Sequence, residues 1–145
     1  MIWTPRTTVA AVIERNQRFL FVEEMIAGKM TLNQPAGHLE NNESLIDAVI
    51  RETQEETAWQ FEPTHLVGIY RWQAAQGETY IRYCFCGDLG QHNKEQALDP
   101  DIHQALWLSH SAFLNRQSDI RSPLVADCLS DYLAGQRYPL SLLHN

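Results

Sequence analysis

Three glutamates near the middle of the chain have a spacing that suits metal chemistry. Glu52, Glu55 and Glu56 stand at positions i, i+3 and i+4 of a segment with helical periodicity, so they fall within about 100° of one another on one side of a helix. Like charges placed in this way repel each other unless a cation neutralises them. Carboxylate oxygens without thiolates or paired imidazoles are hard ligands, which favours Mg²⁺, with Mn²⁺ as the alternative, over Zn²⁺.

The helix that must carry these glutamates is well marked. Ser44, followed by Asp47 three residues later, is typical of a helix N-terminus, and the apolar spacing predicts a helix that continues to Thr57. Its apolar face includes Leu45 and Val49 and borders the glutamate stripe. We therefore expect the three carboxylates to lie at the edge of the hydrophobic core and not in free solvent.

The residues in front of the helix extend the pattern. A glycine, an acidic residue six positions later and an Arg-Glu pair eight positions after that precede the last two glutamates. In this order and spacing they resemble the signature of the Nudix hydrolase family, whose box would span residues 37–58. Six signature positions match in register: Gly37, Glu43, Arg51, Glu52, Glu55 and Glu56.

Two positions of the box depart from the signature. Thr53 replaces an aliphatic residue, and Ala58 replaces the final glycine. We expect Thr53 to weaken one contact with the core. We expect Ala58 to disfavour the left-handed helix end that a glycine would allow. Neither change removes a carboxylate, so the box is interpreted as competent.

The resemblance implies a fold and a metal site. The fold would be α/β (α+β), the Nudix α/β/α sandwich with a mixed sheet and two main helices. The metal would be held by the carbonyl of Gly37 and by the three glutamates of the stripe. Arg51 would orient the neighbouring carboxylates, and Glu43 would support the loop or a second metal. The implied catalytic residues are Glu52, Glu55, Arg51 and Glu43.

The resemblance also implies a reaction. Water would attack a phosphorus atom of a diphosphate linked to another group, with divalent metal ions lowering the pKa of the water and offsetting the developing charge. A carboxylate must accept the proton of the water. Glu52 is one candidate, and Asp99 or Asp101 of a later loop is another.

Similarity to one subgroup extends beyond the box. The stretches 33–40 (NQPAGHLE) and 121–140 (RSPLVADCLSDYLAGQRYPL) are similar to those of the NudJ-type phosphatases. This likeness implies release of inorganic phosphate from nucleoside tri- and diphosphates, thiamine pyrophosphate or its hydroxymethylpyrimidine pyrophosphate precursor. The alternatives are a pyrophosphohydrolase that cleaves nucleotide-X compounds internally, and a Nudix-fold sensor that binds a ligand without turnover.

Four further residues are candidates for substrate contact. His38 follows the loop glycine and either touches phosphate or fills the loop. Arg82 stands among apolar residues, so it either forms a buried ion pair or clamps a substrate phosphate. Trp72 either packs in the core or stacks on a substrate ring. Asp101 flanks Pro100 and serves either a turn or the reaction. For Arg71, Arg121 and Arg137 a structural role is favoured.

The remaining elements give the outline of a sandwich. Short strands are expected over 7–13 and 19–23, joined as a hairpin through 14–17, and over 65–72, 80–87 and 105–108. Alternation along 83–86 places Tyr83 and Phe85 on one face of a strand and two cysteines on the other. Residues 25–35 are expected to be irregular, and a second helix is expected over 123–133.

Composition excludes several classes of protein. The chain has 145 residues and a formal charge of −7, which favours one domain over residues 1–145 and argues against nucleic-acid and anionic-membrane binding. Six acidic residues and one arginine between Glu40 and Glu56 give −5 of that charge. No secretory signal or membrane span is recognised, and three cysteines without CxxC spacing favour a reducing cytoplasm. The expected partner is a small pyrophosphate compound, bound by a monomer or a homodimer.

Overall fold

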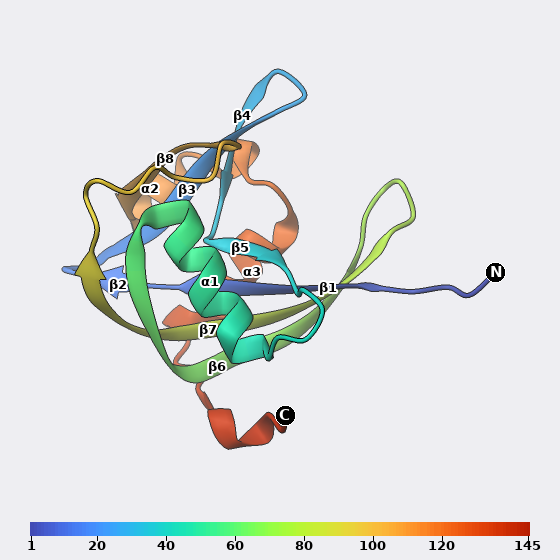
Figure 1. Ribbon diagram of the computed structural model, residues 1–145. Coiled ribbons are helices and arrows are strands. Elements are labelled where there is room, and N and C mark those ends of the chain that lie inside the picture. The colour runs from blue at the N-terminus through green and yellow to red at the C-terminus, as the bar shows by residue number, and fades with distance from the viewer.

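A five-stranded mixed sheet lies at the centre of the fold (Figure 1). In this computed structural model, which describes residues 1–145, the strand order is β5-β1-β7-β6-β9. The strands are β1 (Arg6–Val12), β5 (Ala36–His38), β6 (Trp59–Gln73), β7 (Thr79–His92) and β9 (Tyr138–Pro139). β1 and β7 run parallel, and the other neighbours are antiparallel.

A second, antiparallel sheet is built around β3. β3 (Arg18–Ile26) pairs with β2 (Glu14–Arg15), β4 (Lys29–Asn33) and β8 (Ile102–Ser109). The expected turn at 14–17 is present, with positive φ at Asn16 and Gln17, as in the tight hairpin turns that match strand twist. However, it joins β3 only to the two-residue β2, because β1 belongs to the central sheet.

Two main helices cover opposite faces of the central sheet, as expected. α1 (Leu45–Thr57) contributes Val49 to a cluster with Phe85, and α3 (Pro123–Leu133) contributes Cys128 to a cluster with Cys84. The alternation along β7 therefore supplies both layers of the core. The shorter helical elements are α2 (His110–Leu114), η1 (Gln117–Asp119) and η2 (Leu140–Leu142). No helix of the fold has both the length and the apolar character needed to cross a bilayer.

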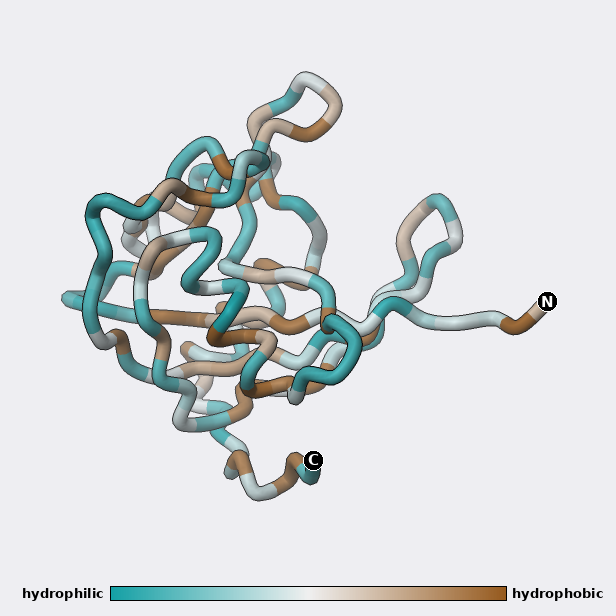
Figure 2. The backbone as a smooth tube through the Cα atoms, in the orientation of Figure 1, coloured by the Kyte–Doolittle hydropathy of each residue, from teal (hydrophilic) through white to brown (hydrophobic).

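The expectation of an irregular segment over 25–35 is wrong. β3 continues to Ile26, and β4 follows after a tight turn in which Ala27 and Gly28 have positive φ. This hairpin projects from the body (Figure 1), so its outer residues lack the apolar alternation that would have marked a strand. The β6–β7 hairpin projects in a similar way. Figure 2 shows the hydrophobic stretches running through the interior of the fold, whereas the loop before α1 is hydrophilic.

Candidate active site

The loop before α1 brings a glycine against the glutamate stripe. Ser44 begins the helix by accepting a hydrogen bond from Asp47 N at 3.0 Å, as its sequence predicts. Gly37 lies on β5, and its Cα packs so closely on the carboxylate of Glu52 that a β-carbon at position 37 would overlap it. The first glycine of the box is therefore required for space.

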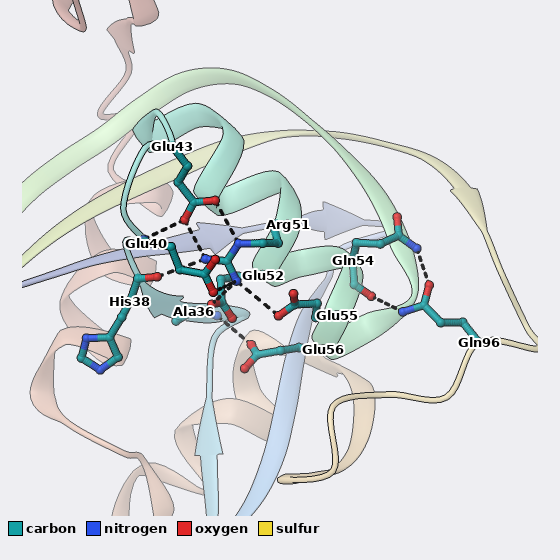
Figure 3. A network of polar contacts seen from close by, with 10 residues as sticks. All are labelled: Ala36, His38, Glu40, Glu43, Arg51, Glu52, Gln54, Glu55, Glu56 and Gln96. Atoms are coloured by element: carbon teal, nitrogen blue, oxygen red, sulfur yellow. Dashed lines mark hydrogen bonds and ion pairs between the residues drawn. The ribbon is translucent and has the colours of Figure 1, made fainter. Parts of the chain in front are cut away.

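Arg51 is the centre of a network of carboxylates (Figure 3). Its guanidinium donates two hydrogen bonds to Glu43, from Nε to Oε2 at 2.9 Å and from Nη2 to Oε1 at 2.7 Å. It also donates to Glu52 at 2.8 Å and to Glu55 at 3.3 Å. Glu43 in turn accepts the backbone N–H of Glu40 at 2.9 Å. Because its two oxygens are engaged in this way, Glu43 braces the loop against the helix.

Glu56 is the most buried member of the stripe. Only 6% of the residue is exposed, and one carboxylate oxygen accepts the backbone N–H of Ala36 at 2.9 Å. Burial, with smaller contributions from the neighbouring Glu52, Glu24 and Asp99, raises the pKa of Glu56 to about 9, although the hydrogen bond from Ala36 opposes the shift. Burial also raises the pKa of Glu52, although Arg51 opposes this shift.

These carboxylates fit a divalent cation in kind and in charge. They are hard oxygen ligands on one side of α1, and desolvation raises the pKa of half-buried Glu52 and of buried Glu56, which a bound cation would offset. They do not converge on one point as they stand, because Glu52 and Glu55 turn toward Arg51 whereas Glu56 turns toward Ala36 (Figure 3). Holding one ion requires Glu52 and Glu55 to turn from Arg51 toward Glu56.

The two departures from the signature have different outcomes. Ala58 ends α1 in the left-handed conformation, with φ 62° and ψ 15°, so the expectation that alanine disfavours this helix end is wrong. Its N–H bonds Gln54 O, and its carbonyl accepts Asn93 N, both at 2.9 Å, so surrounding contacts hold it there. Thr53 is fully buried, and its hydroxyl has no hydrogen-bond partner; a weakened core contact at this position stays a prediction.

A cavity of about 580 Å³ lies beside the box. Its lining includes three of the four candidate substrate residues: His38, Trp72 and Arg82. Trp72 stacks on Tyr80 with ring centroids 5.6 Å apart, so one wall of the cavity is aromatic. His38 is exposed as a residue, but partial desolvation of its imidazole, together with the nearby Arg6 and Arg82, lowers its pKa.

Arg82 resolves one alternative left by the sequence. It is 7% exposed, and its Nη1 donates to the side-chain oxygen of Gln34 at 3.0 Å. No carboxylate lies within ion-pair distance of its guanidinium, so the buried ion pair is not formed. Its Nε is buried without a hydrogen-bond partner. The positive charge thus faces the cavity without a protein counter-ion.

Asp101 does not line the cavity. It is exposed, and its N–H bonds the carboxylate of Asp99 at 3.0 Å in a turn around Pro100. Asp99 N bonds the carbonyl of Glu55 at 2.9 Å, which ties this loop to the end of α1. The structure therefore brings Asp99 nearer to the glutamates than Asp101 and favours it as the loop's candidate base.

Two lining residues of the cavity, Glu24 and Thr8, and the buried Gln34 beside Arg82 are not singled out by the sequence. Glu24 of β3 is half-buried, and desolvation raises its pKa, with Arg121 opposing. Thr8 of β1 is buried with an unpartnered hydroxyl, and Gln34 holds Arg82. Glu24 lies where a strand was not expected to continue, and Thr8 stands next to no recognisable motif. Gln34 belongs to the stretch 33–40, but nothing in that stretch indicates its contact with Arg82. Only the pairing of distant strands brings them together.

Comparison with known proteins identifies the class. A model of the NUDIX domain matches residues 4–128, so the chain belongs to the Nudix family and is a hydrolase, as the box predicts. Proteins named Phosphatase NudJ from Escherichia coli K12 and Shigella boydii serotype 4 are each 41% identical over 142 residues. These alignments cover 98% of this chain and 92% of each relative.

Solved structures agree with the fold. A NUDIX hydrolase from Nitrosomonas europaea superposes with a TM-score of 0.96 at 46% identity, and the match covers 98% of this chain and 97% of that one. A structure described as a UDP-X diphosphatase superposes with a TM-score of 0.75 at 18% identity, covering 96% of this chain and 68% of that one. At that identity the second likeness shows a shared fold.

Proposed function

We propose that this hydrolase is a metal-dependent phosphatase of small pyrophosphate compounds. The observation that carries the proposal is the pair of carboxylates, half-buried Glu52 against Gly37 and buried Glu56 against Ala36, beside a cavity whose Arg82 forms no ion pair. Identity of 41% to Phosphatase NudJ over nearly the whole chain supports phosphate release as the outcome. The proposal treats residues 1–145 as one Nudix domain acting in the cytoplasm.

Some residues of the box bind the metal ion, and others hold the loop in place. Glu52, Glu55, Glu56 and the carbonyl of Gly37 hold Mg²⁺, with Mn²⁺ as a substitute. Once bound, the ion lowers the pKa of the attacking water and neutralises charge on the phosphate oxygens. Arg51 keeps its two hydrogen bonds to Glu43 whether or not Glu52 and Glu55 turn away. Nε and Nη2 bond Glu43, whereas Nη1 bonds Glu52 and Glu55. The loop carbonyls stay in place as a result.

A carboxylate must also accept the proton of the attacking water. Glu52 and Asp99 are the two candidates that we retain. The N–H of Asp99 bonds the carbonyl of Glu55 at 2.9 Å, whereas Asp101 lies two residues further along the loop. Arg82 and the Trp72–Tyr80 pair provide a cation and an aromatic wall for the rest of the substrate. Nucleoside tri- and diphosphates, thiamine pyrophosphate and hydroxymethylpyrimidine pyrophosphate all combine an aromatic ring with adjacent phosphates, and they are the proposed substrates.

A product assay tests this function. The purified chain is incubated with GTP and with thiamine pyrophosphate in Mg²⁺, in Mn²⁺ and in chelator, and the products are separated by ion-exchange chromatography. We expect inorganic phosphate with GDP from GTP, and no reaction in chelator. Release of pyrophosphate with GMP contradicts the phosphatase and supports the internal pyrophosphohydrolase. Tight ligand binding without any product supports the sensor.

Variants of the stripe provide the control. Glu55→Gln and Glu56→Gln keep the size of the side chain and remove one charge from the metal site, so turnover should fall by orders of magnitude while the fold is kept. Activity near the parent level in Mg²⁺ for both variants contradicts the assignment of the metal site.

A further inference from the structure

A row of polar side chains crosses the central sheet on the side of the cavity. His38 of β5, Thr8 of β1 and Arg82 of β7 are register partners on three neighbouring strands. Side chains that are directly opposite in a sheet point to the same face. All three line the cavity beside the box. Thr8 and Arg82 are only 4% and 7% exposed, so they form its floor.

Two donors in this floor lack partners. The hydroxyl of Thr8 and the Nε of Arg82 are buried without any hydrogen bond in the protein. Buried polar groups are nearly always satisfied, so two such groups on adjacent strands indicate that a ligand completes them. Both are able to donate, because a guanidinium N–H only donates and a hydroxyl rotates to suit its partner. The missing partner is therefore an acceptor.

The charge of the floor indicates that this acceptor is an anion. Arg82 is held by the neutral amide of Gln34, which also donates to Ala11 O at 3.3 Å. Arg121 lines the same cavity, and its side chain makes no hydrogen bond or ion pair with the protein. A guanidinium buried without an acid is costly unless an anion accompanies it.

Other charges around the cavity do not cancel these two arginines. Glu78 is already paired with Arg6 at 3.0 Å and accepts the hydroxyl of Tyr80. Glu24 is the remaining acid of the cavity, and Arg121 and Arg82 act on its pKa from a distance, but its carboxylate forms no ion pair with either guanidinium. The N-terminus of α3 adds no free donor, because Ser122 accepts the N–H groups of Leu124 and Val125. The donors available to a ligand are thus Thr8 and Arg82 of the floor, together with the exposed Arg121 of the cavity lining.

We propose that Thr8, Arg82 and Arg121 form an anion subsite that holds one phosphate group of the substrate beside the metal-binding glutamates and also takes free inorganic phosphate. The N–H of Ala36 bonds Glu56, and His38, two residues further along β5, is opposite Thr8. These two positions of the edge strand β5 are therefore about 7 Å apart along the strand, a span that the adjacent phosphates of one substrate cover. The substrate role rests on the proposed function, whereas phosphate binding does not.

Binding of inorganic phosphate in chelator tests the subsite without turnover. Phosphate is titrated into the purified chain in excess EDTA and followed by calorimetry. We expect saturable binding at one site, at least tenfold weaker in Arg82→Met and partly restored in Arg82→Lys. Arg71→Met removes an exposed arginine outside the cavity and should bind like the parent. A parent chain that does not bind phosphate overturns the proposal.

Two isosteric variants separate binding from folding. Gln34→Glu places a carboxylate on Arg82 Nη1, so phosphate binding should be lost although Arg82 is retained. Thr8→Val removes the unpartnered hydroxyl, so it should weaken phosphate binding several-fold without lowering the melting temperature in phosphate-free buffer. Unchanged phosphate binding in Thr8→Val together with a lower melting temperature shows a structural hydroxyl and overturns its place in the subsite.

The same titration distinguishes this proposal from the proposed function. Glu56→Gln should bind phosphate in EDTA like the parent, because Glu56 belongs to the metal site and not to the subsite. Phosphate binding that is sensitive to Arg82, in a chain that hydrolyses no pyrophosphate compound, contradicts only the proposed function. Hydrolysis with phosphate binding that is insensitive to Arg82 contradicts only the subsite.

Discussion

The Cα of Gly37 packs directly on the carboxylate of Glu52, and no side chain fits between them. The backbone of Gly37 does not need glycine for its conformation, because its φ is outside the left-handed region. Space alone selects glycine here. This contact sets the distance between the loop carbonyl and the helix carboxylates, the two parts of the proposed metal site.

Gly37→Ala should therefore lower turnover about 100-fold or more, since displacements of about 1 Å in an active site have effects of that size. It should also lower the melting temperature, because the new methyl group overlaps Glu52. In a Glu52→Ala background the same substitution should cost little stability, which thermal melts of the double-mutant cycle will show. Equal losses of stability in both backgrounds mean that the glycine serves another contact.

Arg51→Lys tests the network around the arginine. A lysine keeps the charge but lacks the planar fork that holds both oxygens of Glu43. We expect turnover to fall at least tenfold and the melting temperature to fall by several degrees. Glu40→Gln is the control, because its 3.5 Å pair with Arg51 involves a side chain that is 65% exposed and should contribute little. A lysine variant that behaves like this control contradicts the bracing role.

Glu56 makes the stability of the metal-free protein depend on pH. The folded-state pKa of Glu56 is about 9, above the ordinary value of 4.5, so between these values the native state binds one more proton than the unfolded state. Stability in chelator should then fall as pH rises from about 4.5 to about 9. Glu56→Gln should not lose stability in this way as pH rises. At pH 8 in EDTA it should therefore melt at least about 5 °C higher than the parent, and at pH 4 this difference in melting temperature should vanish.

Added metal should reverse the order of the melting temperatures of the parent and Glu56→Gln at pH 8. Mg²⁺ should raise the melting temperature of the parent at pH 8 and leave that of Glu56→Gln nearly unchanged. Glu55→Gln, with a side chain that is 44% exposed, should show no such stabilisation in EDTA. A parent chain whose stability does not depend on pH over this range contradicts the buried-acid explanation.

Thr53→Val should stabilise the protein. The Thr53 hydroxyl is buried without a partner, so an isosteric methyl group should raise the free energy of unfolding by about 1 kcal/mol in urea denaturation. Thr57→Val is the matched comparison, because the Thr57 hydroxyl donates to Thr53 O at 2.6 Å and its loss should cost about 1 kcal/mol. The prediction fails if both variants change stability in the same direction.

Ala58→Gly should also stabilise the protein, although by less than Thr53→Val. Ala58 has φ 62°, a conformation that costs an alanine roughly 1–2 kcal/mol, and glycine recovers part of this at the expense of a more flexible unfolded chain. We expect a net gain of up to about 1 kcal/mol. Ala48→Gly in the middle of α1 should instead lose about 1 kcal/mol, and denaturation curves of the two variants will give both signs.

The sequence predicts those parts of the molecule that depend on local pattern. Ser44 marks the start of α1, and Gly37 to Glu56 follow a spacing that a single helix and one loop satisfy. Alternation along β7 identifies the two faces of the central sheet. Each of these features repeats with the period of its own element, so it can be recognised without knowing the partner.

The remaining parts depend on contacts between distant segments. Residues 24–30 of the β3–β4 hairpin include no buried residue, and the buried run 31–33 that follows does not alternate, so the sequence indicates no strand there. Ala58 adopts a strained conformation because Asn93, 35 positions away, bonds its carbonyl. Thr8 reaches Arg82 only through the parallel pairing of β1 with β7. No local spacing specifies such a pairing.

The two projecting hairpins supply opposite walls of the cavity. β3–β4 contributes Glu24 and Ile26, and β6–β7 contributes Trp72, Gln76 and Tyr80, whereas neither contributes a box residue. Lengthening a hairpin tip has a small entropic cost, about 0.6 kcal/mol for each doubling of a loop. Ligand preference can therefore diversify through insertions at two turns while the hydrolytic machinery is inherited intact. Exchanging hairpin tips between relatives is therefore a direct way to change the substrate preference of the enzyme.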